Sequence, residues 1–451
     1  MTSVWDQYPI LQPGNDIHLN MKGGTLFMGY DPISLSIEEA DFLAACDGVH
    51  RVVDAVPRSW SEDYGDLKFL MLISRLVSSG HIILADEPSQ SSSIRITGSR
   101  SAYIPPHMSI ELTAGCNLRC RHCYRESEPS KDEYMPTETL LNVLERLAES
   151  GLRSVELTGG EPLLHKDFLR ILSFCADRFE LVGVLSNGTL ITRDIAERFR
   201  SLGDKLLLSI SLDSSEEDAH DLRRGVPGAF RRTVDNIKLL SDLGVKVRVS
   251  MCVDEESFSD IEKTLLLARD LGAVAFSYTP VLPLGRGREW APPGWNLDGR
   301  EVMQAEEELA RRYRGFLSVL SDEAVCSLEK EEGCGAGYRT YAMDPWGNIR
   351  PCATFGPEEM VIGNLVEGEI EEVFSNPLTE ALAGARVPGN EVCGDCEMSL
   401  FCRYCILRGI LGSKMVRDCS WINLPSSRRI LNISTSVEVS EMGHMSLDNK
   451  I

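Results

Sequence analysis

Hydrophobic and polar positions follow two different periods in the middle of the chain. Short runs rich in apolar and β-branched residues predict six strands, at 108–113, 154–158, 181–186, 206–212, 246–252 and 274–280. Between them, apolar residues recur three and four positions apart, as they do in a helix with one buried face. These helical patterns span 137–147, 166–178, 192–202, 229–243 and 257–271, with Thr137 as the expected N-cap of the first. Strand–helix alternation of this kind predicts a parallel sheet with right-handed crossovers.

The pattern before residue 86 predicts a separate, helix-rich module. It has strands over 25–30 and 80–84 and amphipathic helices over 37–46 and 67–78. A Ser-rich run and a Pro-Pro pair then indicate a linker. The last thirty residues are polar and are expected to form a tail. The predicted organisation is a module over 1–85, a linker over 86–106, a parallel α/β domain over 107–290, a bridging helical segment over 291–325, a cysteine-rich domain over 326–421 and a tail over 422–451.

Length and charge narrow the possible functions. The chain has 451 residues, 43% of them hydrophobic, which allows two to four domains with filled cores. Its 68 acidic residues exceed its 46 basic ones, and the net charge of −22 disfavours nucleic acid as a partner. The first residues lack the basic and apolar regions of a signal peptide, and Lys68 and Arg75 interrupt the most apolar stretch. We therefore expect a cytoplasmic protein that makes no membrane contact.

Eleven of the fourteen cysteines fall into two groups along the chain. In a reducing cytosol such thiols stay free to bind metal. In the first group, Cys116, Cys120 and Cys123 are spaced so that one loop can wrap three thiolates around a single inorganic centre. Iron–sulfur clusters take thiolate ligands, and three ligands on a four-iron cluster leave one iron open. A zinc site that includes His122 is the alternative.

Unusual residues also follow the next three predicted strands. Thr158-Gly159-Gly160-Glu161-Pro162 follows the second strand, Ser186-Asn187-Gly188 the third, and Ser211-Leu212-Asp213 the fourth. In parallel α/β folds the chemistry lies at the carboxyl ends of the strands. The sequence therefore places the cysteine loop and these segments at one edge of the sheet.

A Cys-x3-Cys-x2-Cys loop after the first strand, followed by Gly-Gly-Glu-Pro after the second, resembles the radical S-adenosylmethionine (SAM) superfamily over about 105–290. The resemblance implies a partial (βα)6 TIM-like barrel. It also implies that Cys116, Cys120 and Cys123 hold a catalytic [4Fe-4S] cluster whose open iron chelates SAM. One electron then splits SAM to a 5′-deoxyadenosyl radical that abstracts hydrogen, so the cofactor carries the organic chemistry.

The same resemblance assigns contacts to SAM. The Gly-Gly-Glu segment would bind the amino group of SAM, and two serines would bind its ribose or carboxylate. A tyrosine would lie near the adenine, and an arginine would pair with the SAM carboxylate. Arg223 competes with its neighbour for this last role, and each serine could instead be a turn hydroxyl bonded to backbone. The expected cofactor-binding residues are Tyr124, Gly159, Gly160, Glu161, Ser186, Ser211, Asp213 and Arg224.

The second cysteine group resembles the SPASM extension of peptide-modifying radical SAM enzymes. Counted from Cys334, the sixth cysteine is Cys405, and the chain has two residues before it where the family pattern has three. Eight cysteines suffice for two fully ligated four-iron clusters, giving three clusters in all; a pair of zinc-ribbon sites is the alternative. The resemblance assigns Cys326, Cys334, Cys352 and Cys405 to the first auxiliary cluster and Cys393, Cys396, Cys402 and Cys419 to the second.

Two further expectations concern the substrate. The N-terminal module is similar to the winged-helix-like recognition element of ribosomal peptide (RiPP) maturases, in which an edge strand pairs with a leader peptide; a plain packing domain is the alternative. Cys252 ends the fifth strand, where it could donate a hydrogen atom, as in epimerising relatives, or act as a small buried hydrophobe. Cys46 and Cys175 are expected in the core.

Together these features predict a radical SAM peptide maturase that installs a thioether or carbon cross-link in a precursor peptide. Its partners would be that peptide, with its leader, and an electron donor such as flavodoxin or ferredoxin. A haem-pathway decarboxylase would have to bind an acidic porphyrin, and sulfatase-maturing relatives carry Asp where this chain has Ala353. A leader-binding scaffold without turnover would have no need for an open-site cysteine loop.

Overall fold

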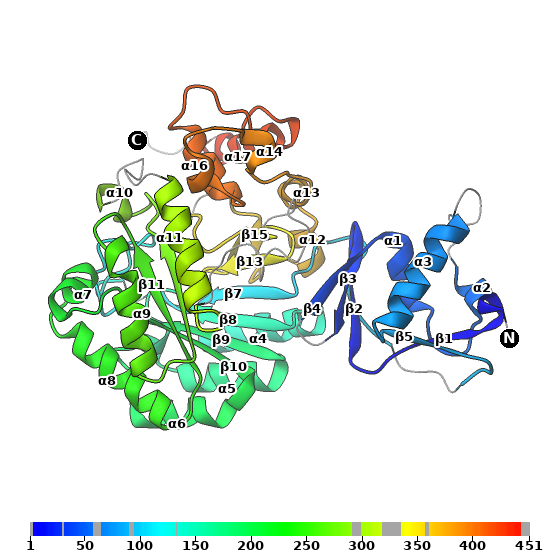
Figure 1. Ribbon diagram of the computed structural model, residues 1–451, viewed down its shortest axis with the longest axis horizontal. Coiled ribbons are helices and arrows are strands. Elements are labelled where there is room, and N and C mark those ends of the chain that lie inside the picture. Colours follow the sequence, from blue (N-terminus) through cyan, green and yellow to red (C-terminus); the bar gives the residue numbers. More distant parts are fainter. Residues whose placement is uncertain are drawn as a thin grey trace, which may run out of the picture. The chain divides into compact units, whose positions relative to one another are not determined.

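The computed structural model describes residues 3–28, 31–56, 65–89, 94–131, 133–290, 299–317, 335–356 and 360–442. The chain divides into two compact units, Met1–Ile104 and Pro105–Ile451 (Figure 1). Short 3-10 helices accompany the longer elements in the described ranges, η1 at Val4–Asp6, η3 at Pro162–Leu164, η4 at Gly203–Lys205 and η5 at Phe258–Asp260.

In its described residues, the N-terminal unit contains two small sheets and three helices. Strand β1 (Tyr8–Leu11) pairs antiparallel with β5 (Ile82–Ala85). The second sheet has the order β4-β3-β2-β6, in which β2, β3 and β4 are antiparallel and β6 lies parallel to β2. Its strands are β2 (Asn15–Asn20), β3 (Gly23–Met28), β4 (Asp31–Leu35) and β6 (Arg95–Gly98), and the helices are α1 (Ile37–Ala44), α2 (Val52–Ala55) and α3 (Gly65–Ser78).

Local sequence explains the start of α1. The Ser36 side chain accepts from the Glu39 backbone N–H, and the Glu39 carboxylate accepts from the Ser36 backbone N–H, which forms a capping box. Phe42 then packs edge to face on Phe69 of α3, with ring centroids 4.8 Å apart, in the core of this unit.

The N-terminal unit differs from its prediction in its strand content and in its boundary, because β1, β2, β4 and β6 lie where the sequence predicts no strand. The sequence predicts a linker over 86–106, but β6 lies inside that stretch and pairs with β2. Tyr103 and Ile104 are also buried, so the unit extends to residue 104. The predicted strand over 25–30 corresponds to β3; Gly29 and Tyr30 lie outside the described residues.

The C-terminal unit is built on six parallel strands. They pair in chain order, and the sheet continues beyond the first strand through β13, which is parallel to it, and then through β14 and β15, which are antiparallel. The six strands are β7 (His107–Glu111), β8 (Ser154–Thr158), β9 (Leu181–Ser186), β10 (Leu206–Ser211), β11 (Val247–Val253) and β12 (Ala275–Pro280), and the additional strands are β13 (Thr340–Met343), β14 (Asn348–Arg350) and β15 (Gly363–Asn364). The predicted α/β class with a parallel sheet is confirmed.

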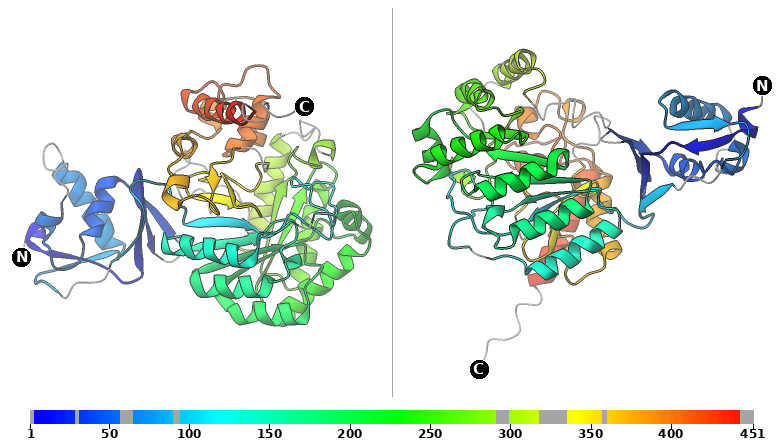
Figure 2. Two further views of the ribbon diagram at one scale, coloured as in Figure 1. Left: turned by 180° about the vertical axis from the view of Figure 1, so that it is seen from behind. Right: turned by 90° about the horizontal axis from the view of Figure 1, so that it is seen from below.

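Helices cover this sheet (Figure 2). The crossover helices are α4 (Thr137–Glu149), α5 (Phe168–Arg178), α6 (Arg193–Leu202), α7 (Glu217–Arg224), α8 (Ala229–Asp242) and α9 (Ile261–Asp270). The expected N-cap of α4 is wrong: Pro136 occupies that position, and the Thr137 hydroxyl instead donates to the Asp167 carboxylate at 2.6 Å. At α6, Thr192 caps the helix by accepting from the Ile195 backbone N–H.

The remaining helices follow the parallel strands. They are α10 (Gly287–Trp290), α11 (Gly299–Arg312), α12 (Ile370–Phe374), α13 (Pro377–Ala383), α14 (Asn390–Cys393), α15 (Ser399–Cys402), α16 (Ile406–Ser413) and α17 (Pro425–Met442). Helix α17 lies where the sequence predicts a tail, and it buries Ser427 and Ile430. None of the helices in the described ranges is long and apolar enough to cross a membrane.

Candidate functional site

The first cysteine group forms a buried cluster in the loop after β7. Cys116 and Cys120 are 7% and 9% exposed and pack with Cys123, Leu118 and the first residue of α8, Ala229. Burial raises the pKa of Cys116 to about 12 and also raises that of Cys120. Thiolates crowded together in this way need a cation to offset their charge and desolvation, so the donor set fits an iron centre.

The two glycines after β8 let this strand end lie directly on the cysteine loop. Gly160 donates its N–H to Thr113 O at 2.8 Å, and Glu161 donates its N–H to Gly115 O at 2.9 Å. A Cβ on Gly160 would lie 1.9 Å from Gly115 O, and Gly159 has a φ of +128°. A side chain at either position would push the two segments apart.

Glu161 is fully buried, and both of its carboxylate oxygens have hydrogen-bond donors. Oε1 accepts from Ser186 Oγ at 2.8 Å and from the Leu163 N–H at 3.3 Å, and Oε2 accepts from the Asn187 N–H at 2.8 Å. Burial raises the pKa of Glu161 to about 7, although these hydrogen bonds act in the opposite direction. The carboxylate thus ties the ends of β8 and β9 together, and Glu161 and Ser186, both expected to contact SAM, bond to each other.

The end of β9 also reaches the cysteine loop. Asn187 Nδ2 donates to Asn117 Oδ1 at 2.9 Å and lies 3.9 Å from Cys116 Sγ. Asn117 Nδ2 in turn donates to Thr189 Oγ1 at 2.8 Å. These amides hold the loop between its first two cysteines.

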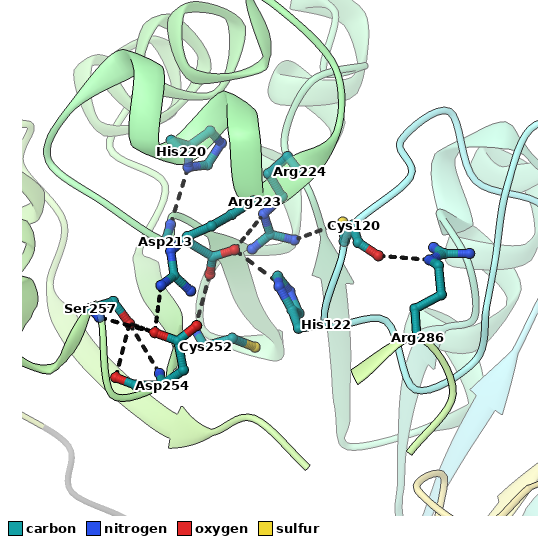
Figure 3. Close-up of polar contacts among 10 residues, drawn as sticks. All are labelled: Cys120, His122, Asp213, His220, Arg223, Arg224, Cys252, Asp254, Ser257 and Arg286. Atoms are coloured by element: carbon teal, nitrogen blue, oxygen red, sulfur yellow. Dashed lines mark hydrogen bonds and ion pairs between the residues drawn. The ribbon is translucent and has the colours of Figure 1, made fainter. Parts of the chain in front are cut away.

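Asp213, just after β10, is the centre of a buried network of charged groups (Figure 3). Its Oδ2 lies 2.8 Å from Arg224 Nε and 3.6 Å from His122 Nε2, and its Oδ1 accepts the Cys252 N–H at 2.9 Å. The Asp213 N–H donates to His220 Nδ1 at 3.1 Å. Burial acts to raise the pKa of Asp213, but Arg224 and the two histidines outweigh it and lower the pKa to about 2.

Histidine 122 takes part in this network. Burial lowers its pKa to about 4, so the imidazole is neutral near pH 7. Its Nε2 faces Asp213, as Figure 3 shows. His122, Asp213 and Cys252 place three possible ligand atoms within 4.8 Å of one another, so this contact is compatible with the zinc alternative that the sequence left open.

Arg223 and Arg224, the two candidates for pairing with the SAM carboxylate, bond to different partners in the structure. Arg224 Nη1 donates to Cys120 Sγ at 3.6 Å, whereas Arg223 Nη2 donates to Asp254 Oδ1 at 2.5 Å. Both side chains are buried at the end of α7. The structure therefore brings Arg224 to the cysteine loop.

Other expected residues lie near this network. Ser211 ends β10 and pairs in register with Ser250 of β11. Burial raises the pKa of Cys252 to about 12, so this side chain stays a thiol. Cys46 and Cys175 are fully buried, as expected.

A second buried network joins the cysteine loop to the C-terminal cysteines. Glu111 Oε2, at the end of β7, lies 2.6 Å from Arg125 Nη2 and accepts from Arg350 Nη2 at 2.8 Å. Arg125 is two residues after Cys123, and Arg350 is two residues before Cys352. Tyr124 packs in the same hydrophobic cluster as Cys352. Residues next to the first cysteine group thus contact residues of the C-terminal group within one unit.

The C-terminal cysteines line two separate cavities. One is lined by the four cysteines Cys393, Cys396, Cys402 and Cys419. The other is lined by Cys352 and Cys405 together with Gly335. Cys326 and Cys334 lie outside the described residues. Neighbouring cysteines 402 and 405 therefore face different cavities, and four thiols around one cavity are a donor set that suits an iron–sulfur cluster.

Comparisons with known proteins identify the family. The chain matches the model of the radical SAM superfamily over residues 110–268 and that of an iron–sulfur cluster-binding domain, SPASM, over 334–397. It is 32% identical over 440 residues to the antilisterial bacteriocin subtilosin biosynthesis protein AlbA of Bacillus subtilis, covering 93% of this chain and 97% of AlbA.

The chain belongs to the radical SAM superfamily.

Two further similarities are more distant. The chain is 29% identical to the AdoMet-dependent heme synthase of Methanosarcina barkeri, over 67% of this chain and 92% of that protein. The crystal structure of Streptococcus suis SuiB bound to S-adenosylmethionine superimposes with a TM-score of 0.63 at 16% identity, covering 93% of this chain and 99% of SuiB. The second similarity supports the fold.

This protein is therefore a radical SAM enzyme of the SPASM subfamily, and its cofactors are SAM and iron–sulfur clusters. The superfamily match spans the cysteine loop, the Gly-Gly-Glu segment and Asp213. The SPASM match includes Cys334, Cys352, Cys393 and Cys396.

Several residues of this radical SAM site were not singled out from the sequence. Asn117, Asn187 and His220 make contacts described above, and Arg286 donates from Nε to Cys120 O at 2.8 Å and from Nη2 to Ser127 O at 2.8 Å. Asn117 and Asn187 lie inside segments that the sequence did single out, which could have identified them. Arg286 is 166 positions from Cys120, and no local motif marks it.

Proposed function

We propose that this radical SAM enzyme modifies a ribosomally made precursor peptide and installs a thioether or carbon cross-link in it. The observation that carries the proposal is the extent of the similarity to AlbA, a bacteriocin biosynthesis protein. Only 7% of this chain is left unmatched, which is less than the N-terminal unit of residues 1–104. The similarity therefore reaches beyond the catalytic core into that unit.

We propose the following roles in the core. Cys116, Cys120 and Cys123 hold the SAM-binding [4Fe-4S] cluster, which with SAM supplies a 5′-deoxyadenosyl radical that removes a hydrogen atom from the peptide. The chain's own contribution is to fix the cysteine loop and to keep water away from it. The proposed SAM contacts are Tyr124, Gly159, Gly160, Glu161, Ser186, Ser211, Asp213 and Arg224.

Two auxiliary [4Fe-4S] clusters complete the proposal and bring the number of clusters to three. The cavity lined by four cysteines supports one of them at Cys393, Cys396, Cys402 and Cys419. The cavity lined by Cys352 and Cys405 supports the other, with Cys326 and Cys334 as the remaining ligands. A small electron-transfer protein such as flavodoxin or ferredoxin is the proposed electron donor.

The N-terminal unit is proposed to hold the leader of the peptide. Strand β4 is an edge of the four-stranded sheet, so its outer backbone groups can pair with an added strand. Helix α3 also exposes apolar side chains, with Leu67 and Met71 each 66% exposed. A leader held here would raise the effective concentration of the core peptide at the cysteine loop.

A haem-pathway reaction is the second candidate, because the chain also matches a heme synthase over most of that protein. That match leaves a third of this chain unaligned, however, whereas the AlbA match covers nearly all of it. The net charge of −22 also disfavours an acidic porphyrin. The peptide reaction accounts for more of the chain.

Iron content and SAM cleavage test the proposed catalytic core. Anaerobically reconstituted protein should contain about twelve iron atoms per chain, as expected for three four-iron clusters. Replacing Cys116, Cys120 and Cys123 together with Ser should remove about four of them and abolish 5′-deoxyadenosine formation. A content of about four iron atoms per chain, with zinc bound at the remaining cysteines, would contradict the two auxiliary clusters. SAM cleavage by the triple variant would contradict the assignment of the catalytic cluster to this loop.

A further inference from the structure

The last turn of α7 is fixed to the cysteine loop by its main chain. Arg119 donates its N–H to Arg224 O at 3.1 Å, and Arg121 donates its N–H to Arg223 O at 2.9 Å. Gly225 follows with a φ of +71°, and a Cβ there would lie 2.4 Å from Arg119 O. These contacts lie on both sides of Cys120, so the distance from Arg224 to this cysteine is set by the fold.

The Arg224 side chain is held by an ion pair with Asp213, in which neither Arg224 Nε nor Asp213 Oδ2 has a hydrogen-bond partner among the described residues. It is 6% exposed, and its Nε faces Asp213 Oδ2 at 2.8 Å. Asp213 is itself fixed by the Cys252 N–H on its other carboxylate oxygen. A guanidinium is a planar fork of donors, so holding one edge fixes the direction of the other. Its Nη1 then points at Cys120 Sγ, at 3.6 Å, as Figure 3 shows.

A hydrogen-bond donor with a positive charge beside a ligand sulfur changes the reduction potential of an iron–sulfur cluster. Reduction by one electron makes the cluster more negative, so a cation beside a ligand sulfur stabilises the reduced form more than the oxidised form. Hydrogen bonds to the sulfur atoms act in the same direction and are among the factors that set cluster potentials. Burial strengthens both effects, because water does not screen the charges.

We infer that Arg224, held in place by Asp213, is a positioning residue that donates a hydrogen bond to the Cys120 sulfur and so raises the reduction potential of the SAM-binding cluster. This inference rests on the proposed cluster at Cys116, Cys120 and Cys123. It gives Arg224 a role before SAM binds, separate from the pairing with the SAM carboxylate that the family resemblance implies. A milder one-electron donor can then reduce the cluster.

The test is the midpoint potential of the SAM-binding cluster, measured without SAM by redox titration followed by electron paramagnetic resonance. The signal of the triple Cys116, Cys120 and Cys123 variant supplies the background from the auxiliary clusters. Arg224→Met removes both the charge and the donor, and Arg224→Lys keeps the charge but not the fork. Arg223→Met is the matched control, because Arg223 is equally buried in the same turn but pairs with Asp254.

With full iron content, both Arg224 variants should show a more negative potential than the wild type, and the shift should be larger for Met than for Lys. Arg223→Met should stay closer to the wild-type value. An unchanged potential in Arg224→Met, with weaker SAM binding, would overturn the inference and leave Arg224 as a SAM ligand. If the Met variant does not assemble the cluster, an unchanged potential in Arg224→Lys overturns it instead. If the loop holds no SAM-binding cluster at all, the wild type and the triple variant would give the same spectrum and the same iron content. That result differs from an unchanged potential, so the two failures can be told apart.

Discussion

At the scale of single residues, the sequence predicts which residues gather at the site better than it predicts their partners. The cysteine loop and the Gly-Gly-Glu segment are local motifs, and the structure places them against each other. The partner of Glu161 is Ser186, and that of His122 is Asp213, 25 and 91 positions away in the chain. Such pairs form only when the carboxyl ends of different strands come together in the folded sheet, which is why a motif gives no sign of them.

Glutamate 161 offers a test at this scale. At pH 8, above its pKa of about 7, both carboxylate oxygens accept backbone N–H groups, from Leu163 and Asn187. Glu161→Gln places an amide N–H₂ against one of these donors, so the free energy of unfolding should fall by about 1–3 kcal/mol in denaturant titrations. Ser186→Ala, which removes only the hydroxyl donor, should cost about 1 kcal/mol or less. A Gln variant as stable as the wild type would show that Glu161 does not tie the two strand ends together.

At the scale of elements, the buried parallel strands were predictable and the strands of the N-terminal unit largely were not. Strands β8 and β9 match their predicted bounds because β8 alternates apolar with polar residues and β9 is a short, mostly apolar run. Strand β6 is four residues long, half of it exposed, and lies beside a Ser-rich stretch. It pairs with β2, about 79 positions earlier, for example Ile17 with Ile96. A non-local pairing of this kind leaves no local pattern.

The turn between α15 and α16 divides the auxiliary ligands, and this can be measured. Cys402 shares a cavity with Cys419, whereas Cys405 faces the cavity of Cys352. The double variant Cys402→Ser/Cys419→Ser should therefore lose about four iron atoms, and Cys405→Ser/Cys419→Ser about eight. Iron analysis after anaerobic reconstitution distinguishes the two. Equal losses from both pairs would contradict the division.

At the scale of the whole molecule, the chain has two compact units, to which we assign different roles: peptide binding to the N-terminal unit and the radical reaction to the C-terminal unit. The C-terminal unit brings both cysteine groups together through Glu111, whose partner Arg350 is 239 positions away. The N-terminal unit carries its own core and ends at residue 104, after β6. Residues 1–104 are therefore the part to remove when the role of this unit is tested, although the sequence alone places the boundary at 85.

The most direct measurement of the central claim is the mass of the peptide product. The reconstituted enzyme, with SAM and reductant, should convert its proposed precursor peptide to a product lacking two hydrogens for each cross-link. Protein lacking residues 1–104 should keep its iron and its uncoupled SAM cleavage, while peptide modification falls at least tenfold, about 1.4 kcal/mol of binding. The full-length enzyme should be equally poor on a peptide without its leader. Full activity of the truncated protein on the precursor, or an unchanged peptide mass while the full-length enzyme cleaves SAM, would contradict the account.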